Sequence, residues 1–333
     1  MLKPTPRRVR RALSNPRLFR AWGHHFVGKI LHTLYASIAL SVLSRWPVGE
    51  NVYDDEWDLL IVLDACRVDA IRAVAPEYDF IDRIDTRLSL GSITSEWLSQ
   101  TFTHEYAEEI AETVYVSANP WTERIFTDGV RPEDLSKLPL VWTSWDTVDA
   151  SQFEHLEPAW TYESTGEFGI PGGRTPPRYV TDRAIELGRE RDAERYVVHY
   201  IQPHAPYTAR AFAEGRPLEE KEADFALYLR QGHKKADVWP CYLDELRFVL
   251  DSVRLLLENF DADTAVITAD HGEAFGEYGI VEHPTAVPLP QLRRVPWIEV
   301  SATDGGDYRP VTDPVDGSAR VDIESRLANL GYR

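Results

Sequence analysis

The stretch AVITADHGEAF, residues 265–275, is the clearest indication of the fold class of this chain. Apolar and β-branched residues lead directly into Asp270, His271 and Gly272, so that a carboxylate and an imidazole follow a buried segment. In parallel α/β sheets, ligands bind beyond the carboxyl ends of the strands. The stretch therefore predicts a buried strand over residues 264–268 that delivers Asp270 and His271 to a binding edge.

Two other apolar runs end in the same way. Residues 58–64, DLLIVLD, end at Asp64 and have the continuous apolar character of a central parallel strand covered on both faces. Residues 195–201, RYVVHYI, lead into QPHAPY, which contains His204. Further strands are expected over residues 113–116 and 295–300, and helices over residues 68–74, 179–189 and 239–260 and from about Ser95 onward. This alternation predicts an α/β fold with a mostly parallel central sheet flanked by helices.

The charge divides the chain into two parts. The formal net charge is −18, yet residues 1–49 contain nine Lys and Arg and no Asp or Glu, which leaves −27 for the remainder. We therefore expect a basic N-terminal arm, residues 1–49, and a catalytic domain, residues 50–333. Residues 117–177, rich in Pro, Gly and Trp, are interpreted as a substrate-side insertion in that domain. The acidic body, with Arg far commoner than Lys, is typical of a salt-adapted, halophilic protein.

The basic arm has the pattern of an amphipathic helix. Apolar residues recur at helical spacing between residues 18 and 46, for example at Trp22, Phe26, Ile30, Leu34 and Ile38. Its most apolar part is too short to span a bilayer, and no signal peptide is evident. The arm either lies on an anionic membrane surface or packs on the acidic body. We expect a cytoplasmic or peripherally membrane-associated protein, and no nucleic acid partner, because the body would repel it.

The strand ends carry a metal-ligand set. Asp64, Asp270 and His271 offer two hard oxygen ligands and one imidazole, which suit a single divalent ion such as Mn²⁺, Mg²⁺ or Ca²⁺. Thr94 lies at the start of an expected helix, where backbone N–H groups favour an anion, and is the candidate nucleophile. Ser92 is the alternative, and both residues, like Ser95, also fit ordinary helix caps.

Three more residues are candidates for substrate binding. His204, between two prolines, is expected to contact the substrate and assist the leaving group, although a structural histidine in a turn fits as well. His283, in VEHP, follows DHGE closely enough to return to the same edge. Arg67 either pairs with an anionic substrate or neutralises Asp64 or Asp69. His199 lies inside an expected strand and is interpreted as a core residue.

The segments LLIVLDACRVDA, GSITSEWL, HYIQPHAPY, TAVITADHGE and RRVPWIEV resemble, in this order, the alkaline phosphatase superfamily. The similarity covers roughly residues 55–300 and is greatest to sulfatases and lipoteichoic-acid-synthase-like phosphoglycerol transferases. It implies a metal held by Asp64, Thr94, Asp270 and His271. It also implies that His204 and, less directly, His283 face the substrate.

Departures from the family narrow the expected chemistry. Neither CRVDA at Cys66 nor CYLDE at Cys241 is the motif that sulfatases convert to formylglycine. One metal and a hydroxyl nucleophile favour phosphate over sulfate chemistry. We expect a metal-dependent hydrolase or transferase acting on phosphate or sulfate esters, of a lipid head group or surface glycan, through a threonine nucleophile. The alternatives are a non-catalytic, membrane-associated binding protein on the same fold and, third, an isomerase or mutase. The sequence does not indicate the oligomeric state.

Overall fold

A seven-stranded sheet forms the centre of the computed structural model, which describes residues 31–136, 141–161 and 174–312. The strand order is β2-β9-β6-β1-β5-β3-β4. Four neighbouring pairs are parallel, and the two pairs made by β9 are antiparallel. The strands of this sheet are β1 (Leu59–Leu63), β2 (Asp85–Leu88), β3 (Thr113–Ser117), β4 (His155–Glu157), β5 (Arg195–Tyr200), β6 (Ala262–Thr268) and β9 (Arg294–Ala302). The predicted mostly parallel α/β sheet is thus confirmed.

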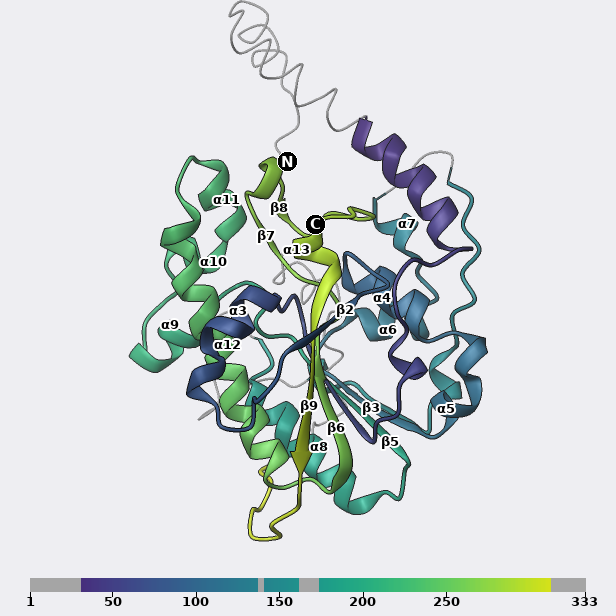
Figure 1. The fold of residues 1–333 in the computed structure, drawn as a ribbon, viewed down its shortest axis with the longest axis vertical. Coiled ribbons are helices and arrows are strands. Elements are labelled where there is room, and N and C mark those ends of the chain that lie inside the picture. The colour runs from purple at the N-terminus through teal and green to yellow at the C-terminus, as the bar shows by residue number, and fades with distance from the viewer. Residues whose placement is uncertain (1–30, 137–140, 162–173, 313–333) are drawn as a thin grey trace, which may run out of the picture.

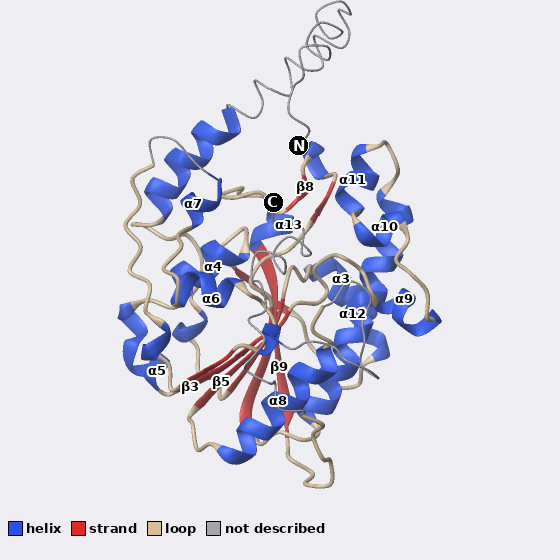
Figure 2. Cartoon of the chain, turned by 180° about the vertical axis from the view of Figure 1, so that it is seen from behind, coloured by secondary structure: helices blue, strands red, loops and turns tan. Residues whose placement is uncertain are grey.

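Helices cover both faces of the sheet (Figures 1 and 2). Alternate residues of β1 divide between the faces, because successive strand side chains point in opposite directions. Leu59, Ile61 and Leu63 pack into one cluster, whereas Leu60 and Val62 pack into the other. The first face carries α3 (Val68–Val74), α8 (Pro177–Glu190) and α12 (Lys235–Leu257), and the second carries α4 (Thr94–Thr101), α5 (Ala107–Ala111) and α6 (Trp121–Phe126).

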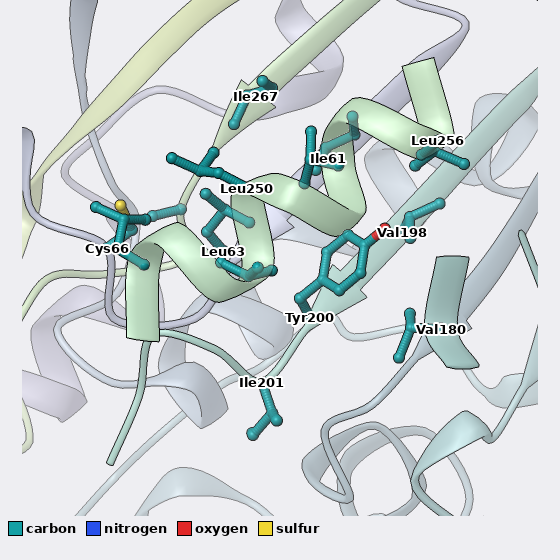
Figure 3. Packing of buried hydrophobic residues seen from close by; sticks show 14 of the residues in the cluster. Ile61, Leu63, Cys66, Val180, Val198, Tyr200, Ile201, Leu250, Leu256 and Ile267 are labelled. Atoms are coloured by element: carbon teal, nitrogen blue, oxygen red, sulfur yellow. The ribbon is translucent and has the colours of Figure 1, made fainter. Parts of the chain in front are cut away.

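The long helix α12 supplies much of the first face. Leu250 and Leu256 on α12 belong to the same fully buried cluster as Ile61 of β1 and Ile267 of β6 (Figure 3). The helix begins four residues before the predicted start at Trp239 and includes Pro240. Full burial of one such side chain is worth roughly 1.5–3 kcal/mol, so this contact is a main anchor of α12 on the sheet.

The insertion has more regular structure than predicted. Within its described residues, α6, α7 (Pro132–Ser136) and the edge strand β4 interrupt the loops, with short 3-10 turns at Ala150–Gln152 and Ala159–Thr161. Residues 162–173 of the predicted insertion lie outside the described residues. β4 adds to β3 in parallel, so this part of the chain completes one edge of the sheet.

Five elements lie around the carboxyl ends of the parallel strands, namely α9 (Ala209–Glu214), α10 (Glu220–Ala223), α11 (Phe225–Arg230), α13 (Pro290–Arg293) and the hairpin of β7 (Ala274–Phe275) and β8 (Val281–Glu282). Further 3-10 turns are at Val52–Asp54, Ala75–Glu77, His104–Tyr106 and Glu277–Gly279. Residues 31–43 form a helix, as their amphipathic pattern predicts, whereas residues 1–30 lie outside the described residues. None of the helices in the described ranges has the length and apolar character that crossing a bilayer requires.

Candidate active site

Four segments bring their polar side chains together at the carboxyl edge of the sheet. Asp64 follows β1, Asp270 and His271 follow β6, Thr94 begins α4, and Asn119 lies in the loop after β3. All five side chains are fully buried. The structure therefore brings together the four residues predicted as metal ligands and adds Asn119, which the sequence analysis missed.

Thr94 faces His271 and does not cap its helix. The residue at the cap position of α4 is Ile93, and no side chain caps the helix, so the capping interpretation of Ser92, Thr94 and Ser95 is wrong. The Thr94 hydroxyl oxygen lies 3.2 Å from Nε2 of His271 and 3.5 Å from the amide nitrogen of Asn119. Ser92, the alternative nucleophile, donates its hydroxyl hydrogen toward Glu96 and the carbonyl of Pro284.

The hydrogen bonds within the site determine which atoms of His271, Asp270 and Asp64 keep a lone pair available for a ligand. Nδ1 of His271 lies 2.8 Å from the carbonyl oxygen of Gly272, an arrangement that requires the proton on Nδ1 and leaves a lone pair on Nε2. Oδ1 of Asp270 accepts hydrogen bonds from the backbone N–H groups of Ala65 and His271. Oδ2 of Asp64 accepts from Asn119 at 2.7 Å. The second oxygen of each carboxylate is buried without a hydrogen-bond donor.

These unsatisfied acceptors surround one point. Nε2 of His271 lies 3.4 Å from Oδ2 of Asp270 and 3.7 Å from Oδ1 of Asp64. Burial, and then the neighbouring Asp270, raise the pKa of Asp64 well above its usual value, while burial lowers the pKa of His271. Buried acceptors of this kind carry a desolvation cost unless a donor or a cation faces them. Two carboxylates, an imidazole and a hydroxyl fit a divalent cation.

His199 of β5 is a further member of this cluster that the sequence analysis took for a core residue. Its Nε2 lies 4.0 Å from Oδ2 of Asp270, and its Nδ1 lies 2.8 Å from the hydroxyl of Tyr115. Nitrogen and oxygen atoms of Asp64, His199 and Asp270 lie within 4.8 Å of one another, close enough to share an ion. Burial lowers the pKa of His199 to about 4, so its ring is neutral near pH 7.

A second group of potential ligands lies beside the first. Atoms of His204, Glu273 and His283 lie within 4.8 Å of one another, and the ring centroid of His283 lies 4.5 Å from that of His271, with the two rings tilted by 38°. Glu273 is the fourth residue of the DHGE motif, but the sequence analysis assigned it no role. Its carboxylate oxygens lie 3.2 and 3.3 Å from Nδ1 of His283.

The two histidines of this group differ in their affinity for a proton. Burial, and then the charge that His283 would carry, lower the pKa of His204 well below its usual value. Burial also disfavours the charged form of His283, but the Glu273 carboxylate outweighs it and raises the pKa of His283. At neutral pH His283 is therefore the better proton donor of the two.

Arg67 is buried and already engaged. Its guanidinium donates to both oxygens of Asp69, to Glu277 and to the backbone carbonyl of Glu273. These contacts correspond to the interpretation of Arg67 as a partner of Asp69. Through the Glu273 carbonyl, the same guanidinium fixes the chain just after His271.

A buried carboxylate, Glu96, connects helix α4 with the loop that contains His283. Oε2 of Glu96 accepts hydrogen bonds from the N–H and hydroxyl groups of Ser92, and Oε1 accepts from the N–H of Ala286 at 2.6 Å. Burial raises the pKa of Glu96. Because Glu96 is on the same helix as Thr94, and Ala286 follows His283 closely, Glu96 ties the two parts of the site to each other.

No family model and no curated protein matches this chain. Solved structures similar to it include the soluble domain of lipooligosaccharide phosphoethanolamine transferase A from Neisseria meningitidis, with 15% identity, a TM-score of 0.45 and coverage of 76% of this chain and 79% of that one. The periplasmic domain of a phosphoethanolamine transferase from Escherichia coli, in complex with Zn, has 12% identity, a TM-score of 0.41 and coverage of 78% and 76%. A 2-O GAG sulfatase has 11% identity, a TM-score of 0.36 and coverage of 73% and 64%.

Proposed function

We propose that this protein is a metal-dependent enzyme that transfers or hydrolyses the phosphate ester of a lipid head group or surface glycan through Thr94. The observation that carries this proposal is the convergence of Asp64, Thr94, Asp270 and His271, with buried acceptor atoms that a divalent cation would satisfy. One of its structural neighbours is a lipooligosaccharide phosphoethanolamine transferase, an enzyme that transfers a phosphate-containing group. Attachment of residues 1–49 to an anionic membrane surface is proposed separately, because it does not depend on this chemistry.

In the proposed reaction the side chains have separate roles. Asp64, Asp270, His271 and the Thr94 oxygen would hold the divalent cation, which when bound polarises the ester and favours the ionised hydroxyl. Thr94 Oγ1, as the alkoxide whose proton has passed to solvent, forms a bond to phosphorus while the bond to the leaving alkoxide breaks. Water or an acceptor alcohol then releases the phosphoryl group from Thr94.

The His204–His283 pair faces the leaving group in this proposal. His204 contacts the substrate, and the proton that the leaving oxygen needs comes from His283, because Glu273 raises the pKa of that ring. Arg67 is given no contact with the substrate, since Asp69 and Glu277 occupy its guanidinium.

Phosphate is favoured over sulfate because no formylglycine precursor is in position. Cys66 is fully buried and its sequence lacks the motif for that conversion, whereas the Thr94 oxygen lies at the proposed metal position. Burial raises the pKa of the Cys66 thiol, which makes it a poor nucleophile.

Turnover of p-nitrophenyl phosphate, bis-p-nitrophenyl phosphate and p-nitrophenyl sulfate with Mn²⁺, Mg²⁺, Ca²⁺ or Zn²⁺ tests the proposal. Thr94→Ala is expected to lower kcat at least ~10³-fold, since it removes the nucleophile. Ser95→Ala is the matched control, because its buried hydroxyl has no hydrogen-bond partner and should be dispensable. Equal activity of wild type and Thr94→Ala would exclude Thr94. Tight metal binding without turnover of any ester would favour the non-catalytic binding protein.

A further inference from the structure

Helix 31–43 presents an apolar face to solvent. Ala36 and Leu40 are fully buried against the body, which accounts for one side of the helix. On the other side Leu31, Leu34, Ile38 and Val42 recur every three or four residues and are 44–67% exposed. Exposed apolar side chains aligned on one helix face mark an interaction surface more often than scattered ones do.

A segment one hundred residues away extends this face. The backbone N–H of Trp142 donates to the hydroxyl of Ser41 at 2.9 Å, and that of Ser144 donates to the hydroxyl of Ser44 at 3.1 Å. The guanidinium of Arg45 donates to the carbonyl of Trp142. The Trp142 side chain is nevertheless 83% exposed, and Trp46, just after the helix, is 68% exposed. Two indoles therefore flank the aliphatic stripe.

We propose that this surface, formed by Leu31, Leu34, Ile38, Val42, Trp46 and Trp142 and called the docking face, binds the interface of an anionic lipid bilayer. Aliphatic side chains flanked by Trp are the composition that inserts into the head-group region of a bilayer.

The charge of this end of the chain is complementary to an anionic bilayer. The first 49 residues carry nine positive charges and no negative one, so this end of the chain attracts anionic lipid head groups. The rest of the chain carries −27 and would be repelled by the same lipids. Docking is therefore expected to be oriented, with the docking face toward the lipid and the acidic body away from it.

The docking face is linked to the active site by two hydrogen bonds. The Tyr35 hydroxyl on helix 31–43 donates to the carbonyl of Ala286 at 2.8 Å, and the N–H of Ala286 donates to Glu96 of helix α4, which begins at Thr94. Helix 31–43 lies at the same end of the molecule as α13 and the β7–β8 hairpin, which follows Asp270 and His271 (Figures 1 and 2). Docking would thus place the site close to lipid head groups. A lipid as the substrate rests on the proposed function, whereas docking itself does not.

Co-sedimentation of the full-length chain with vesicles tests this inference. Wild type is compared on phosphatidylcholine vesicles and on vesicles that also contain phosphatidylglycerol, next to the double variant Ile38→Gln/Trp142→Gln. Neither substitution changes the charge, so a difference reports apolar insertion. We expect wild type to bind the anionic vesicles. The double variant should partition onto them at least about tenfold more weakly. The matched control is Val311→Gln, which changes an exposed apolar residue near α8, and should bind as wild type does.

Turnover of bis-p-nitrophenyl phosphate, a soluble ester, is measured in the same samples. Unchanged turnover by the double variant shows that it is folded and that only docking is lost. If wild type binds vesicles but does not turn over the ester, the proposed function is rejected and the docking proposal is retained. Equal vesicle binding by wild type and the double variant, or no binding by wild type, would overturn the inference. A wild-type dimer in light scattering that the double variant dissociates would overturn it too, by assigning the face to a second copy.

Discussion

Replacing Asp64 with Asn should stabilise the metal-free protein and abolish most of the stabilisation by metal. In the structure, Oδ2 of Asp64 accepts a hydrogen bond from Asn119, which an amide oxygen can also do. Oδ1 has no donor and lies 3.7 Å from the lone pair on Nε2 of His271. An amide NH₂ at that position would face acceptors instead of repelling them, and the repulsion from Asp270 would end.

The size of both effects follows from the site. Removing one unsatisfied buried charge should raise the free energy of unfolding by about 2 kcal/mol without metal, or a few degrees in Tm. At a metal concentration of about 100 times the Kd, wild type gains about 2.7 kcal/mol. If the loss of one carboxylate ligand weakens binding about 100-fold, the gain of Asp64→Asn at the same concentration is only about 0.4 kcal/mol. The order of the two stabilities should therefore reverse when metal is added.

Urea unfolding in EDTA and in Mn²⁺ measures both effects. The control is Asp58→Asn, which changes the carboxylate at the opposite end of β1, where the oxygen accepts a hydrogen bond from the N–H of Thr264. This control should respond to Mn²⁺ as wild type does. Two results would contradict this: Asp64→Asn is less stable than wild type in EDTA, or Mn²⁺ raises its free energy of unfolding by as much as that of wild type. Either result would mean that Asp64 is a structural residue and that the metal site is wrongly assigned.

Three further outcomes are expected. Glu273→Gln removes the charge that raises the pKa of His283, so the alkaline limb of the pH profile of kcat/KM should move to lower pH. An alkaline limb that does not move would mean that His283 is not the proton donor. Glu96→Gln turns one of two acceptor oxygens into a donor that faces an N–H group, and should lower the free energy of unfolding by about 2 kcal/mol and lower turnover. An unaltered urea midpoint would contradict the structural link that Glu96 makes between α4 and the His283 loop. Raising KCl should increase the free energy of unfolding, because salt screens the repulsion within the acidic body, and a decrease would argue against salt adaptation.

The parallel sheet was predictable because its central strands are covered on both faces. The runs that became β1, β5 and β6 are rich in apolar residues, and each leads within two residues to a polar residue that could be assigned to the carboxyl edge. β2 was missed because its four residues, DTRL, are partly exposed and polar and carry no strand pattern.

Asp64, Thr94, Asp270 and His271 could be selected by their positions at element ends, but their partners could not. Asn119 resembles any loop amide, and its role appears only when β3 is placed beside β5. His199 lies inside an apolar strand, where a core histidine is the usual interpretation. The roles of both residues depend on strand order, which local patterns do not contain.

Anomalous diffraction from crystals soaked in Mn²⁺ would locate the proposed metal ion itself. One manganese peak is expected within about 2.0–2.4 Å of a carboxylate oxygen of Asp64, a carboxylate oxygen of Asp270, Nε2 of His271 and the Thr94 hydroxyl. A fully soaked crystal with no peak there, or with manganese bound only elsewhere, would contradict the proposed metal site.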